Sequence, residues 1–354
     1  MEKFAVAAAI VVAGVFTLGS IFHWGGDGTH FSFHGGRDGF YIGPDVADAK
    51  PIARGAAQAY AANSLIVRNA AAVLHVIPEE RSDISISVTG GEALPALSVG
   101  IAGTQLVIDG GLRGRSRTCG KENDVFFVHW PRSQRVVQAQ MPVITARVPM
   151  DVRLDADWAV QSDIGPSRSA DLSFASCAPQ AIGPVAGALH VDTSGSGDVI
   201  AQTAGEASVD SAGSSDIVLG DVAGPLAAQL SGSGSVRAGN VTGKADLDLA
   251  GSGTIEVGVI GGPLSADLAG SGDLIAASAS GDLDFSLAGS GDLTVRGGIA
   301  GRIEANVAGS GDIVFEGEAA SIEANIVGSG DVRVKKVTGK VEQSAIGSGK
   351  VIIG

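Results

Sequence analysis

Basic residues are scarce in this chain of 354 residues, which has 24 Lys and Arg against 38 Asp and Glu and a formal net charge of −14. From Ala186 to the C-terminus the sequence holds 9 basic and 21 acidic residues, a difference of −12. A nucleic-acid-binding surface needs clustered Lys and Arg to neutralise phosphates. We therefore expect no nucleic-acid partner.

Catalytic motifs are also missing. The sequence has no Gly-x-Ser-x-Gly, no Gly-x-x-x-x-Gly-Lys and no His-Glu-x-x-His. Enzymes that act on polysaccharides need clustered acids and bases in a groove, usually on long loops, whereas the turns here are short and the repeats hold one histidine, His190. We predict a protein that is not an enzyme and uses no cofactor, with a polysaccharide-acting enzyme as the less favoured alternative.

Cysteine is limited to Cys119 and Cys177, which lie 58 residues apart. Neither belongs to a Cys-x-x-Cys motif. In an exported protein the pair could form one disulfide, and two unconnected buried thiols are the alternative.

Charge is absent from Phe4 to Phe22. As a helix this run of 19 residues would be about 28 Å long, close to the hydrocarbon thickness of a bilayer. It predicts a membrane anchor in residues 1–24, with a cleaved signal peptide as the alternative. Either one places the rest of the chain outside the cytoplasm. Residues 25–62, rich in Gly and Ala, are expected to be a linker.

Short apolar runs with period-two alternation characterise residues 63–185 and predict strands. We expect an irregular β region here that forms the first coils of a larger solenoid. The expected strands include 65–67, 73–77, 84–88, 106–108, 125–130, 136–141, 144–148, 152–154 and 172–174.

A basic segment interrupts this region between Gly110 and Asn123. It carries Arg113, Arg115, Arg117 and Lys121 among glycines and polar residues, which predicts an exposed loop. Such a loop could bind an acidic partner, for example a lipid headgroup or an anionic polymer, and a solvated loop without a partner is the alternative.

The C-terminal half is built on a repeated Gly-Ser-Gly-Asp motif. Nine copies follow one another at spacings of 18 to 20 residues, and a fixed period in this range predicts a solenoid. The copies begin at Gly195, Gly213, Gly232, Gly251, Gly270, Gly289, Gly309, Gly328 and Gly347.

Alignment of the copies predicts which side chains point inward. The residue after the Asp position and the residue two further on are apolar in every copy, as with Leu274 and Ala276, and the residue between them varies. A second period-two segment precedes each motif, and glycines mark a second turn. Two strands and two turns per coil predict an all-β fold, a right-handed parallel β-helix over residues 186–354 with coils of about 19 residues.

The Asp of the motif is predicted to lie at a corner and to accept hydrogen bonds from backbone N–H groups of its own turn. A calcium site is the weaker alternative, because each turn offers one carboxylate whereas calcium prefers six to eight oxygens. The weak calcium candidates are Asp198, Asp216, Asp273, Asp292, Asp312 and Asp331.

Acidic residues also line the outward positions of the second strand, among them Asp246, Asp248 and Glu304. We expect a solubilising face there, with loose cation binding as the alternative. The sequence stops inside a coil without a polar cap, so Val351 and Ile353 are expected to pair with a second copy or another protein.

Repeated Gly-Ser-Gly-Asp coils after an exported N-terminus resemble the bacterial GIN domain, a family also described as the head domain of auto-transporter adhesins. The resemblance covers residues 63–354 and implies a right-handed β-helix in the bacterial cell envelope, in the periplasm or on the surface. It implies no catalytic residue. We expect a non-enzymatic envelope protein for adhesion, scaffolding or binding of a surface polymer or another protein. A self-assembling structural protein is the alternative.

Overall fold

The computed structural model describes residues 31–36, 39–44, 46, 49–113, 118–123, 125–130 and 134–354. These residues form 31 strands and one short 3-10 helix, η1 (Gln138–Gln140). No helix among them is long and apolar enough to cross a membrane, and the predicted membrane segment at residues 4–22 lies outside them.

The strands fall into an N-terminal group and a repeat group. The N-terminal group is β1 (Phe31–Gly36), β2 (Gly39–Pro44), β3 (Lys50–Pro51), β4 (Gln58–Tyr60), β5 (Ser64–Glu79), β6 (Ile84–Gly90), β7 (Ser98–Ala102), β8 (Gln105–Asp109), β9 (Thr118–Glu122), β10 (Val125–His129), β11 (Arg135–Val137), β12 (Pro142–Pro149) and β13 (Asp151–Ile164). The repeat group is β14 (Ser169–Ser176), β15 (Gln180–Ile182), β16 (Val185–Thr193), β17 (Val199–Ala201), β18 (Ala204–Gly213), β19 (Asp216–Leu219), β20 (Leu226–Gly232), β21 (Ser235–Ala238), β22 (Ala245–Gly251), β23 (Thr254–Ile260), β24 (Leu264–Gly270), β25 (Asp273–Gly289), β26 (Leu293–Val295), β27 (Gly298–Gly309), β28 (Ile313–Gly328), β29 (Val332–Val337), β30 (Val341–Gly347) and β31 (Val351–Ile353).

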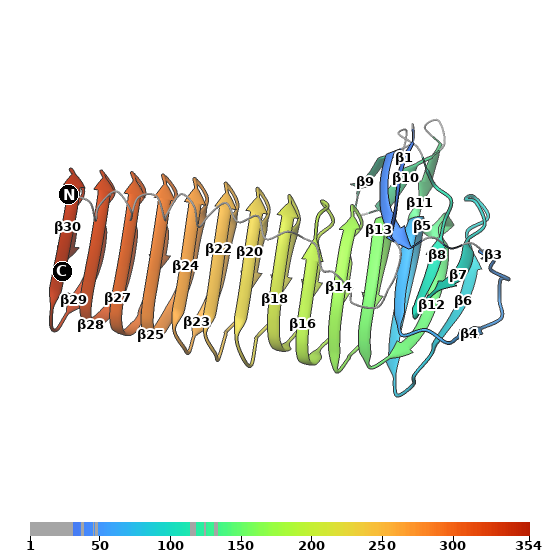
Figure 1. Ribbon diagram of the computed structural model, residues 1–354, viewed down its shortest axis with the longest axis horizontal. Helices are drawn as coiled ribbons and strands as arrows, with labels where there is room; N and C mark the ends of the chain where they lie inside the picture. Colours follow the sequence, from blue (N-terminus) through green and yellow to red (C-terminus); the bar gives the residue numbers. More distant parts are fainter. Residues whose placement is uncertain are drawn as a thin grey trace.

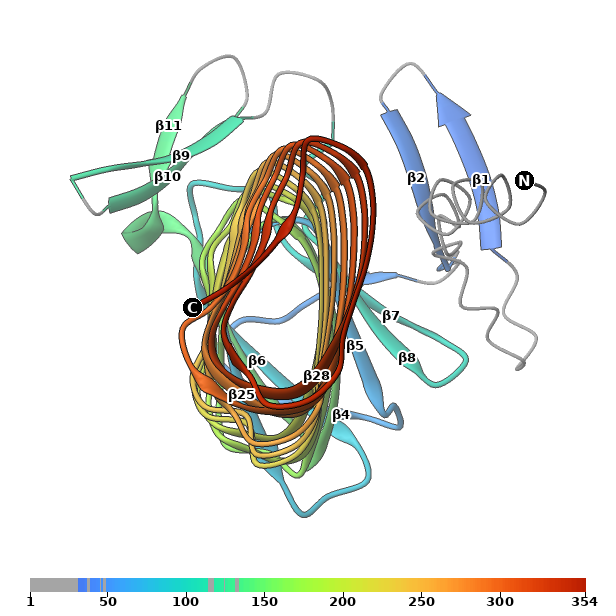
Figure 2. The same cartoon turned by 90° about the vertical axis from the view of Figure 1, so that its left-hand side faces the viewer.

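The repeat group forms a parallel β-helix, as predicted. Each strand pairs in parallel with the equivalent strand one coil further on, for example β20 with β22 and β22 with β24. The coils stack along the long axis of the molecule (Figure 1) and outline a flattened oval when viewed along that axis (Figure 2). The oval has two broad sides, which we call face A and face B.

Face A consists of the strands that precede the motif, and face B of those that follow it. Face A contains β14, β16, β18, β20, β22, β24, β27, β30 and the C-terminal parts of β25 and β28. Face B contains β15, β17, β19, β21, β23, β26, β29, β31 and the N-terminal parts of β25 and β28.

The predicted inward positions are the core. On face B, Val199 pairs with Ile217 and Ile217 with Val236, and all three side chains are fully buried. The spacings of 18 and 20 residues do not break these ladders. Both are absorbed by register shifts at the second turn, between Val185 and Ala188 and between Gly281 and Leu283.

The connection from face B back to face A adds a third inward ladder, which the two-strand coil predicted from sequence does not include. Val222, Val241 and Ile260 stack through isolated parallel bridges and are buried. One apolar residue per coil is enough to continue the core across the short side of the oval, because each lies directly above the one before.

The corner at Gly270–Asp273 shows why the Gly-Ser-Gly-Asp motif needs its glycines. Gly270 has a φ of +129°, which favours glycine. Gly272 has no room for a side chain, because a Cβ there would overlap the carbonyl oxygen of Gly253 in the preceding coil. A Cβ on Gly270 would likewise overlap the carbonyl oxygen of Gly251, so both glycines allow the close stacking of coils and Gly270 also allows the turn.

The N-terminal strands continue the solenoid with less regular coils. β5 contains two of the predicted runs in one long bent strand and pairs in parallel with β12, β13 and β8. The segment predicted as a linker contains strands, since β1 and β2 form an antiparallel hairpin and β3 and β4 pair with β7 and β6.

Two local predictions were wrong. The segment from Gly110 to Asn123 is not entirely loop, because β9 lies in it and pairs with β10. The strand expected at 136–141 ends at Val137 and continues as η1. Both misses concern one unit, the three-stranded sheet β9–β10–β11 with η1, which projects from one flank of the solenoid (Figure 2).

Candidate functional site

The motif aspartates connect successive coils. Asp273 Oδ1 accepts a hydrogen bond from the backbone N–H of Asp292 at 3.2 Å, and Asp292 Oδ1 accepts one from Asp312 at 2.9 Å. The same contact joins Asp312 to Asp331 at 2.8 Å and Asp331 to Lys350 at 3.2 Å. The prediction that the donor lies in the same turn is therefore wrong. The donor N–H lies in the next coil, because the coils stack within hydrogen-bonding distance.

The first two copies follow the same pattern with a variation. Asp198 Oδ1 lies 3.4 Å from the backbone nitrogen of Asp216, and Asp216 Oδ1 accepts a hydrogen bond from the Ser235 hydroxyl at 2.6 Å. Each motif carboxylate thus has one oxygen engaged in holding the next coil. This geometry favours a structural role over the calcium site considered from sequence.

Face A presents polar side chains in continuous rows along the axis. Asp248 and Asp267 stand side by side on neighbouring strands and both are exposed. The row that contains them, from the N-terminal end, is Asp155, Ser173, Asp192, Asp210, Gln229, Asp248, Asp267, Ser286, Asn306, Asn325 and Ser344. We call it the polar row.

A second row runs parallel to the polar row on face A. It consists of Arg153, Asp171, His190, Ser208, Ala227, Asp246, Ser265, Asp284, Glu304, Glu323 and Glu342. The predicted acidic stripe is thus two rows of side chains, polar at every position except Ala227, with acidic residues in both.

The crowding of carboxylates changes their acidity. Although Asp248 keeps contact with solvent, desolvation by the surrounding protein raises its pKa, and the neighbouring carboxylates of Asp267 and Asp246 raise it further. Burial and the charge of Glu304 likewise raise the pKa of Asp284. Negative charge therefore accumulates on face A at some cost in free energy.

Three side chains near the N-terminal end of face A lie close enough to share one cation. The ligand atoms of His190, Asp192 and Asp210 all lie within 4.8 Å of one another, and His190 Nε2 lies 3.2 Å from Asp192 Oδ2. That hydrogen bond raises the pKa of His190, although burial opposes it. Burial and then the Asp192 charge raise the pKa of Asp210. All three side chains keep contact with solvent.

The basic segment predicted as a partner surface is partly used within the fold. Arg113 Nη2 lies 2.7 Å from Asp109 Oδ2, and Arg68 Nε lies 3.0 Å from the same oxygen. Lys121 lies exposed on β9. Arg115 and Arg117 lie outside the described residues. Binding of an acidic partner at this segment stays a prediction.

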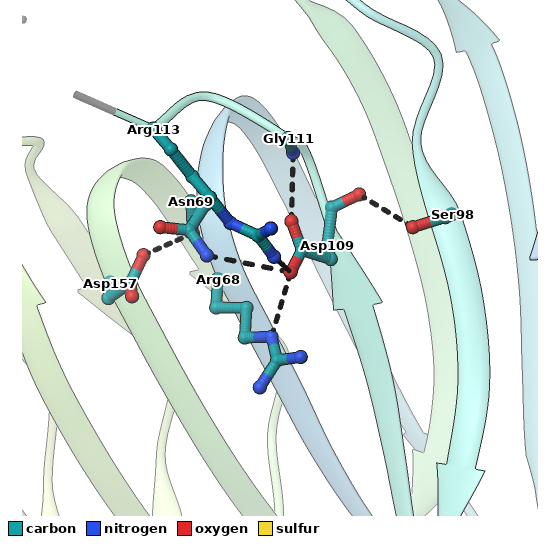
Figure 3. A network of polar contacts seen from close by, with 7 residues as sticks. All are labelled: Arg68, Asn69, Ser98, Asp109, Gly111, Arg113 and Asp157. Carbon is teal, nitrogen blue, oxygen red and sulfur yellow. Dashed lines mark hydrogen bonds and ion pairs between the residues drawn. The ribbon is translucent and has the colours of Figure 1, made fainter. Parts of the chain in front are cut away.

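Asp109 is the centre of a buried polar network (Figure 3). Its Oδ1 accepts a hydrogen bond from the backbone N–H of Gly111 at 2.8 Å, while Asn69 Nδ2 lies 3.5 Å from Oδ2. The backbone N–H of Asn69 in turn donates to Asp157 Oδ1 at 2.5 Å. Sequence reasoning did not find this network, because its members lie up to 88 residues apart. It fixes the point where the chain leaves the solenoid toward β9.

Asp155 lies beside this network and at the N-terminal end of the polar row. Although it keeps contact with solvent, desolvation by the surrounding protein raises its pKa to about 6, the charge of Asp157 adds to the shift, and Arg68 opposes it.

Cys119 and Cys177 form a disulfide that ties β9 to a corner of the solenoid, with a Cα–Cα distance of 6.5 Å. A small core adds to this attachment, in which Phe126, Val128 and Val136 pack against Ala71 and other corner residues. Cys177 occupies the corner position that exposed serines fill in later coils. A cysteine at a position where later coils have an exposed serine is the sequence signal that the projecting unit covers this corner.

The two C-terminal residues predicted to contact a partner differ in exposure. Val351 is half-buried against the core, and Ile353 is 46% exposed. Both belong to β31, which pairs with β29. Self-association through this coil stays a prediction.

Comparison with known proteins agrees with the repeat architecture. The family model described as "Putative auto-transporter adhesin, head GIN domain" matches residues 185–262 and 247–354. Two solved structures from Parabacteroides distasonis ATCC 8503 are similar. A "putative lipid binding protein" is 18% identical over 86% of this chain and 98% of its own, with a TM-score of 0.29. A "putative adhesin" is 14% identical over 84% and 96%, with a TM-score of 0.27. No curated protein matches.

Proposed function

Because the repeat region, residues 185–354, belongs to the GIN domain family, we propose that this protein is a non-enzymatic surface protein of the bacterial envelope. Its ligand in this proposal is a neutral, hydroxyl-rich polymer, which lies along face A. The predicted N-terminal membrane segment would hold the β-helix at the envelope, with the repeats extending away from it.

One observation carries the proposal: the polar row is continuous across the coils. Parallel strands place equivalent side chains about 4.8 Å apart, so a polymer lying along the axis meets the same kind of group at every coil. Carboxylates, amides and hydroxyls all accept hydrogen bonds from sugar hydroxyls. Many weak contacts on one ligand add up through effective concentration, so no single deep pocket is required.

The charge of face A selects among polymers. Desolvation, and then the charges of neighbouring carboxylates, raise the pKa of Asp248, and a sulfated or phosphorylated polymer would bring further negative charge to the same surface. Neutral polysaccharides avoid this repulsion. The repeat turns are short, and the acidic groups are distributed in rows rather than paired across a cleft, which supports binding rather than hydrolysis.

The test uses an array of neutral and anionic envelope polysaccharides. Replacement of Asp248 and Asp267 by Ala removes two adjacent exposed acceptors from the centre of face A. The control replaces Glu206 and Glu256 by Ala, which removes the same charge from exposed positions outside the two rows. We expect neutral polymers to bind the wild type and the control alike, with at least tenfold weaker binding to the face A variant.

Two results would contradict the proposal. Equal binding by the face A variant and the control would move the contact away from face A. Preferential binding of anionic polymers would contradict the charge argument. Release of reducing ends from any polymer during incubation would favour the enzyme alternative instead.

A further inference from the structure

A groove of about 820 Å³ lies between face B and the unit formed by β9, β10, β11 and η1. Its floor is the outer surface of the first coils and includes Val73, Ala181 and Ile200, while Val125 and Ala139 of the projecting unit line the opposite side. Its volume is in the range of small-molecule sites. It is separate from face A and from the polymer contact proposed there.

The groove is pre-formed, because both of its walls are fixed. The floor is a paired sheet in which Val73 lies next to Gln161 and Ala181 next to Ile200. The opposite wall is held by the disulfide of Cys177 and by its own small core. Binding of a ligand would therefore carry no entropy cost for ordering these walls.

Polar groups line several parts of the groove, and two of them, Gln161 Oε1 and Ser162 Oγ, are buried without a hydrogen-bond partner among the described residues. A buried acceptor without a donor is unfavourable, so a ligand that donates a hydrogen bond gains affinity there. At the rim, His75 Nδ1 lies 3.5 Å from Asp163 Oδ2, and both side chains are exposed to solvent.

The charge of the lining restricts the ligand further. Among the described lining residues there is neither Lys nor Arg, and the formal negative charge belongs to Asp163. A carboxylate or phosphate would find no fixed positive partner and would meet this negative charge. The apolar surface around Val73, Val125 and Ile200 suits a hydrocarbon chain.

We propose that this groove binds a neutral amphipathic small molecule. Its apolar chain packs between the face B floor and the projecting unit, and a hydroxyl or amide N–H of its polar end donates a hydrogen bond to Gln161 Oε1. No Phe, Tyr or Trp lines the groove within the described residues, so the apolar part of the ligand is recognised by aliphatic contact.

The experiment uses 1-monolauroylglycerol as the neutral probe, with laurate and dodecylamine as charged probes of the same chain length, all below their micelle concentrations. Native mass spectrometry of the full chain counts bound molecules, and titration gives the affinity. We expect one monolauroylglycerol per chain and at least tenfold weaker binding of laurate. Q161L should weaken monolauroylglycerol binding at least tenfold.

A second variant tests the location without touching the core. A181W places a large side chain on the exposed floor of the groove, while T294W places the same side chain on the same row of face B several coils away. We expect A181W to abolish binding and T294W to leave it unchanged, with equal unfolding midpoints. Absence of saturable binding, undiminished binding by A181W, or tighter binding of laurate would each overturn the proposal. None of these results bears on polymer binding by face A.

Discussion

The carboxylate of Asp292 accepts a hydrogen bond from the backbone N–H of Asp312, 2.9 Å away in the next coil. Asp312 repeats this contact with Asp331. The corner therefore carries a series of side-chain contacts beside the backbone ladders of the two faces. Copies with Ser235 or Thr254 in place of Asp interrupt the series without interrupting the strands.

Removal of one such carboxylate should destabilise the fold by a small and measurable amount. We expect Asp292→Ala to lower the free energy of unfolding by about 1 kcal/mol, the usual net contribution of one hydrogen bond. Asp292→Asn keeps a side-chain oxygen as acceptor and should lose less than half of that. Denaturant unfolding of both variants is the measurement. Equal losses for Ala and Asn would mean that the charge, and not the hydrogen bond, stabilises the corner.

The third residue of the motif should tolerate substitution much less than the second. In Gly272→Ala the new Cβ would overlap the carbonyl oxygen of Gly253 and lie 2.9 Å from Leu249 Cδ2. We expect a loss of about 2 to 4 kcal/mol, since the coils cannot separate locally without breaking ladder hydrogen bonds. Ser271→Ala is the matched control at the exposed neighbouring position and should be near neutral. A thermal midpoint for Gly272→Ala within error of the control would contradict this account.

Stability should rise as the pH falls from about 6 to about 4. Burial, and then neighbouring carboxylates, raise the pKa of Asp248 above that of the unfolded chain. Such a group stabilises the fold below its unfolded pKa, and this contribution is lost as the pH rises through its folded pKa. Burial and the charge of Asp157 raise the pKa of Asp155 to about 6, so its contribution is lost between about pH 4 and about pH 6.

The opposite sign applies to Asp312. Burial works against ionisation there, but the hydrogen bond from Asp331 and the guanidinium of Arg333 outweigh it and lower the pKa of Asp312. Its contribution is present above the unfolded pKa and is lost as the pH falls through the lower folded value. We therefore expect a maximum of the thermal midpoint in mildly acidic solution. Asp155→Asn should flatten the rise between about pH 6 and about pH 4, and an unchanged pH profile in that variant would contradict the assignment.

The repeat architecture could be predicted because every coil has the same sequence pattern. Apolar residues such as Leu274 and Ala276 alternate with exposed ones, and the glycine corner returns at a nearly constant interval. The third ladder was missed because a single apolar residue per coil, such as Val241, has no period of its own within the coil.

The projecting unit and its groove could not be predicted, since their contacts join distant parts of the chain. Gln161 gives no sign in the sequence that its side-chain oxygen is buried, and the wall opposite it comes from residues 125–139. The Cys119 and Cys177 pair was considered from sequence, but its place at a solenoid corner follows only from the stacking of Cys177 below the serine positions. The Asp109 network likewise depends on three separate strands meeting at one point.

Loss of the disulfide should release the projecting unit before it affects the repeats. In the chain-entropy account, a bond that closes a loop of 58 residues contributes about 4 kcal/mol. We expect Cys119→Ser with Cys177→Ser to increase the rate of limited proteolysis within residues 110–141 at least tenfold, while the repeat region stays resistant. Dithiothreitol should produce the same change in the wild type and none in the double variant. If the segment were cleaved equally fast with and without the disulfide, the small core around Phe126 would be sufficient to hold the unit, and the covalent bond would not determine the height of the groove.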